Sequence, residues 1–80
     1  MIHVEVTQED AQHVLYHFSH PQGAQPGSFT TSLIDAAVHA DQGNLARLSL
    51  GFPSLVGAVQ AATQIIGGID FLVQVARGER

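Results

Sequence analysis

Apolar residues recur at helical spacing along most of the chain. The spacing predicts helices over residues 8–18, 29–40, 42–50 and 53–66, because apolar side chains return every three or four positions in each range. Residues 69–76 fit a helix or a strand, and we favour the helix. Apolar and polar residues alternate over 2–6, which indicates a strand. The pattern predicts an all-α bundle of four or five short helices, with room for a short N-terminal β-strand.

Two helix signals meet at a joint formed by Gly51-Phe52-Pro53. Asp41 is a good N-cap for the helix over 42–50, since its carboxylate can accept hydrogen bonds from free amides of the first turn. Gly51 is expected to end that helix in the left-handed conformation and Pro53 to open the next, because proline's fixed φ suits the first helical position. This helix is expected to turn three leucines inward, Leu45, Leu48 and Leu50.

Other helix boundaries are marked by capping and turn residues. Thr7 can cap the first helix and is followed by two acidic residues, which suit the positive end of the helix dipole. Residues 19–28 contain two prolines and two glycines without periodicity, so they form a loop or mobile linker. Ser28 or Thr30 can cap the helix that follows.

Length and composition limit the class of protein. Eighty residues make one domain, residues 1–80, with a small core. The absence of cysteine excludes a disulfide framework and a thiol nucleophile, and it fits a reducing compartment. Charged residues are only 12% of the chain, against about 25% in a typical domain, while hydrophobic residues reach 45%. A single copy can therefore hardly cover its surface with charge.

This excess of apolar surface predicts a partner, most simply another copy of the chain. The contact is expected at Ile34, Val38 and Val56, because they lie outside the apolar stripe that one small core can accept. A closed, symmetric homo-oligomer follows, since an open assembly would aggregate.

The charge balance argues against nucleic acid as a partner. The net charge is −4 and the three basic residues are all arginines, so no basic face can neutralise phosphates. A helix-turn-helix over 29–50 is the alternative, with Asn44 and Arg47 as base readers. Arg47 is otherwise expected to pair with a carboxylate such as Asp41, Asp35 or one from a neighbouring subunit.

One uncharged stretch of the chain has the length of a membrane span. Residues 48–69 form a run of 22 without charge or histidine, long enough to cross a bilayer. Pro53 and two glutamines on one helical face argue against that reading. The N-terminus lacks the positive and apolar regions of a signal peptide, so we expect a cytoplasmic protein.

His13, His17 and His20 are the candidates for chemistry. They are spaced i, i+4 and i+7, and the first two could share a metal ion on the polar side of the first helix. Solvent-facing histidines explain the spacing better, because no accompanying ligand motif is present. Serine, histidine and aspartate all occur, but without a nucleophile-elbow context. We therefore expect no enzyme activity, no cofactor and no metal.

Residues 32–59 resemble the central motif of small, mostly uncharacterised helical proteins encoded by actinobacteriophages. The matching residues are Ala40-Asp41, Asn44-Leu45-Ala46-Arg47-Leu48 and Gly51-Phe52-Pro53. The resemblance implies a phage accessory protein expressed in a bacterial host, and it transfers no active-site residue.

The sequence thus favours a non-enzymatic phage accessory protein that self-associates and engages a host protein. Two alternatives stay open: a DNA-binding regulator with a helix-turn-helix-like element, and a metal protein with histidine ligands.

Overall fold

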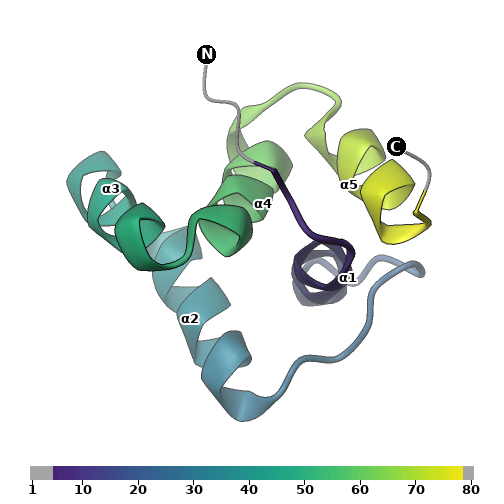
Figure 1. The fold of residues 1–80 in the computed structure, drawn as a ribbon, viewed down its shortest axis with the longest axis horizontal. Helices are drawn as coiled ribbons and strands as arrows, with labels where there is room; N and C mark the ends of the chain where they lie inside the picture. The colour runs from purple at the N-terminus through teal and green to yellow at the C-terminus, as the bar shows by residue number, and fades with distance from the viewer. Residues whose placement is uncertain (1–4, 79–80) are drawn as a thin grey trace.

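Helix α4 (Pro53–Gln64) lies at the centre of the fold and contacts each of the other four helices. The computed structural model describes residues 5–78, which form five helices and no strand. The other four are α1 (Gln8–His17), α2 (Ser28–His39), α3 (Gln42–Gly51) and α5 (Gly68–Ala76). Figure 1 shows α1 and α5 on one side of α4, and α2 and α3 on the other. The prediction of an all-α bundle is confirmed.

The two ambiguous segments have different outcomes. Residues 69–76 belong to α5, so the helical reading of that segment is confirmed. The strand expected over 2–6 falls largely on residues that the structure does not describe. No helix within residues 5–78 is long and apolar enough to cross a membrane, and the uncharged run over 48–69 is divided among three helices.

Side-chain caps begin two of the helices as expected. The Thr7 hydroxyl accepts a hydrogen bond from a first-turn amide of α1 at 3.1 Å, and the Asp41 carboxylate does the same for α3 at 2.8 Å. Helix α2 differs. Its N-cap is Gly27, without a side-chain hydrogen bond, while Ser28 and Thr30 already lie inside the helix. The predicted cap of α2 is therefore wrong.

The joint between α3 and α4 turns at Phe52. Gly51 is the last residue of α3 and its φ is not positive, so the expected left-handed cap at Gly51 is wrong. Phe52 has φ −134° and ψ 60°, outside the helical region. A residue before proline is pushed out of the helical conformation by the proline ring, so Phe52 breaks the helix without a left-handed residue. Pro53 opens α4, as predicted.

Helix α1 ends in a left-handed residue that the sequence did not mark. Ser19 has φ 60°. Its N–H donates to the Tyr16 carbonyl, and the N–H of His20 donates to the Leu15 carbonyl, both at 2.9 Å. These two bonds form a Schellman motif, in which glycine is the usual left-handed residue. The loop over 19–27 then lies against α1, where the Ala24 N–H donates to a carbonyl in the middle of the helix.

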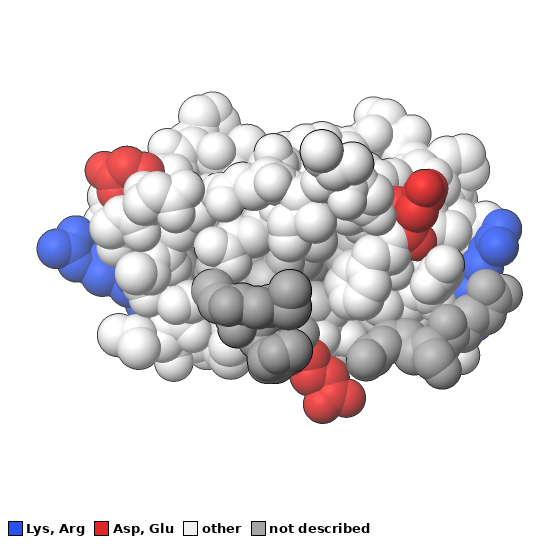
Figure 2. All heavy atoms as spheres, turned by 90° about the horizontal axis from the view of Figure 1, so that it is seen from above, with Lys and Arg blue, Asp and Glu red and all other residues white. Residues whose placement is uncertain are grey.

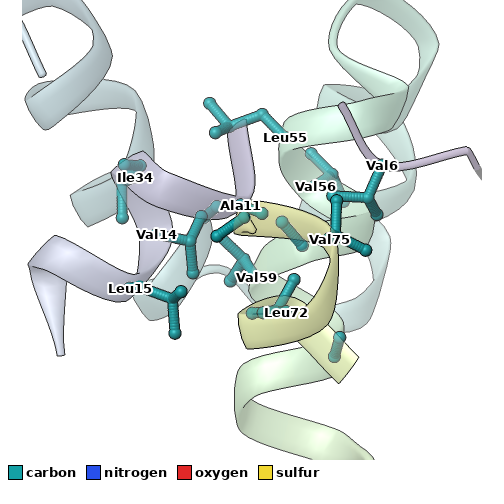
Figure 3. Close-up of a cluster of buried hydrophobic side chains, with 14 of the residues drawn as sticks. Val6, Ala11, Val14, Leu15, Ile34, Leu55, Val56, Val59, Leu72 and Val75 are labelled. Atoms are coloured by element: carbon teal, nitrogen blue, oxygen red, sulfur yellow. The ribbon is translucent and has the colours of Figure 1, made fainter. Parts of the chain in front are cut away.

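The core is aliphatic throughout. Figure 3 shows its side chains converging from α1, α4 and α5, with Ile34 reaching in from α2. No polar or charged side chain within residues 5–78 is buried. The buried set is Val6, Ala11, Val14, Leu15, Ile34, Ala37, Leu45, Leu55, Val56, Ala58, Val59, Ala61, Leu72, Val75 and Ala76.

The expected positions of four apolar residues need correction. Ile34 is 0% exposed and Val56 is 1% exposed, so neither presents surplus surface for a partner. Helix α4 is contacted by all four other helices, and more than one stripe of its surface is therefore buried. Val38 is half-buried and packs against the core. Leu50, expected to point inward, is 87% exposed because it lies on the side of α3 away from α4.

The chain buries an ordinary amount of surface for its size. Its accessible surface of 4980 Å² is close to the about 4700 Å² expected of a monomeric protein of 8.5 kDa. The chain therefore has a core of normal size, and a missing core does not explain the low charge content. What matters is which residues lie at the surface in place of charged ones.

Candidate interaction surface

All of the phenylalanine and tyrosine side chains lie at the surface. The four phenylalanines and the one tyrosine are each exposed by more than a third, and Phe29 reaches 67%. Phenylalanine is usually among the most buried residue types, so a core without any aromatic ring is unusual. Exposed aromatic side chains are typical of protein interfaces, where they supply much of the contact energy.

One group of exposed apolar residues lies at the start of α4. The rings of Phe29 and Phe52 pack together with their centroids 6.1 Å apart. They border a groove of about 290 Å³ between the start of α2 and the α3–α4 joint. Asp10 also lines this groove, and Leu50 is exposed on the adjoining end of α3. We call this region the Phe29–Phe52 groove.

A second group lies at the other end of α4, about 18 Å away along a helix of this length. Helix α4 stops at Gln64, two residues earlier than predicted, and Ile65 takes an extended conformation. Gly67 then has φ 79°, and the Gly68 N–H donates to the Ile65 carbonyl at 2.9 Å. This tight turn projects both isoleucines outward: Ile65 is 60% exposed and Ile66 is fully exposed.

These isoleucines border an open groove of about 660 Å³ between α4, α5 and the segment before α1. We call it the α4–α5 groove. Its lining within the described residues carries no charge, and its polar side chains are the amides of Gln60 and Gln64. The full lining is Val6, Gly57, Gln60, Ala61, Gln64, Ile65, Ile66, Gly67, Gly68 and Phe71.

Charged groups are sparse on the side of the molecule that carries the α4–α5 connection. That connection is at the top of Figure 1, and Figure 2 views the molecule from above. The basic side chains stand at the two opposite ends of this face, and most of the remaining surface belongs to residues other than the four charged types. Such a surface has little charge to keep it hydrated.

Two of the three candidate histidines lie in a separate hollow. His17 and His20 line a space of about 530 Å³ between α1, the loop after it and α2. The Nδ1 atom of His17 lies 3.6 Å from an Asp35 carboxylate oxygen, and His20 Nδ1 accepts from the Gln22 N–H at 3.0 Å. His13 is half-buried, and its Nδ1 has no hydrogen-bond partner among residues 5–78.

The hollow does not bring three metal ligands together. Within residues 5–78, no group of three or more histidine, aspartate or glutamate side chains is placed to hold a metal ion. Ser19 lines the same hollow as His17, with Asp35 beside the imidazole. A hydrolase triad requires a hydrogen bond between the nucleophile and the base. In the described part of the chain the Ser19 hydroxyl makes no hydrogen bond to either histidine.

The two candidate base readers bind each other. Arg47 donates to the Asn44 side-chain oxygen at 2.9 Å, on the exposed side of α3. No carboxylate in residues 5–78 lies within ion-pair distance of Arg47, so the expected pair with Asp41 or Asp35 does not form there. Arg47 is also the single basic residue of α3, which leaves that helix few contacts to offer to phosphates.

The residues of the exposed apolar surface do not stand out in the sequence as exposed. Helical spacing alone places Ile65 and Ile66 on one face with the other apolar residues of 53–66, and Phe29 on one face with Leu33, which predicts buried side chains. The Gly67-Gly68 pair is the one available signal: it predicts a break close after the two isoleucines, although it does not predict that the helix already ends at Gln64. Comparison with known proteins adds no assignment, since no family model, curated protein or solved structure matches the chain.

Proposed function

We propose that this protein is a non-enzymatic interaction protein that self-associates through its exposed apolar surface. The observation that carries the proposal is the placement of every phenylalanine and tyrosine side chain at the surface of a molecule whose core is aliphatic. A chain with this many aliphatic residues can fill a small core without the rings. Their exposure leaves hydrophobic area that association would remove from water.

The magnitude of the effect supports the proposal. Burying a large apolar side chain contributes about 1.5–3 kcal/mol. Two or three such side chains at one contact begin to offset the entropy that association costs, which is at least about 4 kcal/mol. Ile65, Ile66 and Phe71 at one end of α4, or Phe29, Leu50 and Phe52 at the other, could supply this.

The same surface chemistry would also serve a contact with a host protein. That accessory role in a bacterial cell is part of the proposal, and its support is the resemblance of residues 32–59 to phage-encoded proteins. The resemblance names no partner, so self-association is the part that purified protein can test directly.

The test is the mass of the purified protein in solution. Light scattering across a range of protein concentrations should give a mass above 8.5 kDa that rises toward a fixed multiple of it. A mass that stays near 8.5 kDa at every concentration would show that the chain does not self-associate. Mass that grows without limit would indicate aggregation, and the closed assembly would then be abandoned.

A further inference from the structure

The geometry points to the occupant of one of the two grooves: we propose that the α4–α5 groove takes a second copy of this chain, related to the first by a two-fold axis. This inference rests on the proposed function, because it specifies where and how the chain self-associates. The Phe29–Phe52 groove is not used in this contact.

Charge distinguishes the two grooves. In a two-fold contact the same patch of both subunits meets, so any charge near the axis faces its own copy. Asp10 lines the Phe29–Phe52 groove, and a two-fold contact there would bring two carboxylates toward each other. The described lining of the α4–α5 groove holds no charged residue, so a two-fold contact there places no carboxylate of this lining against its own copy.

The polar groups of the α4–α5 groove also suit a copy of themselves. Gln60 and Gln64 stand one turn apart along α4 and both line the groove. Each carboxamide has two N–H donors and one accepting oxygen, so a glutamine can both donate to and accept from another glutamine. A charged partner would find no opposite charge in the described lining of this groove. A second copy can satisfy these amides while burying Ile65, Ile66 and Phe71.

The size of the groove predicts a weak dimer. A standard interface buries about 800 Å² on each partner, which is roughly a sixth of the 4980 Å² surface of this chain. It also takes about 20–30 residues a side, and the described lining of the groove has ten. The contact therefore belongs to the smallest class of protein interfaces. We expect the dimer to have a dissociation constant in the micromolar range.

The test compares two glutamate variants with equal change in charge. Ile66→Glu places a carboxylate in the α4–α5 groove, and Leu50→Glu places one beside the Phe29–Phe52 groove. Neither should disturb folding, because Ile66 is fully exposed and Leu50 is 87% exposed. In sedimentation equilibrium, Ile66→Glu should be monomeric at concentrations at which the wild type and Leu50→Glu are dimeric. Circular dichroism should show the same helix content for all three proteins.

The results of this experiment distinguish self-association from the choice of the α4–α5 groove as its surface. A wild type that is monomeric throughout overturns both. If the wild type associates and Leu50→Glu alone dissociates it, self-association stands and the α4–α5 groove is the wrong surface.

Cross-linking tests independently whether α4 lies at the contact between the two copies. The chain has no cysteine, so Gln64→Cys and Ala46→Cys each introduce a single thiol. Both positions are exposed, the first in the α4–α5 groove and the second on α3. A short bis-maleimide should link Gln64→Cys into a species of about 17 kDa, twice 8.5 kDa, and leave Ala46→Cys unlinked. The reverse pattern would overturn the proposed surface.

Discussion

Gly68 lies directly against the carbonyl group of Ala61. A Cβ atom added at Gly68 would fall well inside the van der Waals radius of the Ala61 oxygen and of its carbonyl carbon. The contact is backbone to backbone, so no side chain can move aside. The first turn of α5 therefore docks on α4 at a distance that only glycine permits at this position.

We expect Gly68→Ala to be strongly destabilising, because α5 must shift away from α4 to admit the methyl group. Overpacking of this kind costs up to about 3 kcal/mol. For a domain of this size, that corresponds to a fall in Tm on the order of 12–24 °C. Thermal unfolding followed by circular dichroism measures the change. A loss below about 0.5 kcal/mol would show that α5 is free to move on α4.

Gly51→Ala is the matched control, with the opposite expected sign. Gly51 is helical, its φ is not positive, and an added Cβ meets nothing within 4 Å. Alanine is favoured over glycine in a helix, so the protein should gain about 0.5 kcal/mol. Gly51→Val should be close to neutral, whereas a left-handed cap would have made it costly. A large loss of stability in either variant would instead support a left-handed conformation at Gly51.

Ser19→Gly should stabilise the protein. Ser19 holds the left-handed position of the Schellman motif at φ 60°, where an L residue pays a steric cost of about 1–2 kcal/mol. Glycine removes that cost. It also raises the conformational entropy of the unfolded chain, which offsets part of the gain, so the free energy of unfolding should rise by about 0.5–1 kcal/mol. Ser19→Ala keeps the Cβ and should show no gain, as urea unfolding of the two variants can determine.

Two glutamines of α1 bind one carbonyl oxygen at the end of α5. The Gln8 and Gln12 amides donate to the Ala76 oxygen at 2.8 and 3.1 Å. Either glutamine alone still satisfies this oxygen, so we expect Gln8→Ala and Gln12→Ala to cost about 0.5 kcal/mol each, and the double variant about 1.5–2 kcal/mol. Chemical denaturation of all four proteins gives the coupling. Strictly additive losses would mean that the two bonds act independently.

The Asp41 cap should depend on its oxygen atom and not on its charge. Asp41 Oδ1 accepts from the Asn44 N–H at 2.8 Å, at the start of α3. Asp41→Ala should cost about 1 kcal/mol, while Asp41→Asn should be nearly neutral because asparagine caps equally well. Thermal unfolding at neutral pH checks both. Equal losses in the two variants would indicate that the carboxylate charge, and not the cap, stabilises α3.

The positions of the helices could be predicted from local sequence signals. Their periodic apolar spacing, the caps at Thr7 and Asp41 and the proline at the start of α4 are local signals, and a helix depends on hydrogen bonds between residues four apart. The boundaries were therefore close to those observed. The glycine pair after Ile66 marked the last break, although it did not show that α4 ends before both isoleucines.

Which apolar residues are buried depends on how the helices pack together, and local sequence signals do not give that packing. Ile34 and Phe29 lie on the same helix, yet the first is fully buried and the second is largely exposed. Helical spacing gives the relative directions of side chains but not the positions of the neighbouring helices, and burial depends on those neighbours. The same holds for Gly68 and Gly51. Local sequence marks both as helix breakers, whereas the need for glycine at Gly68 comes from the approach of α4, a contact between residues brought together by folding.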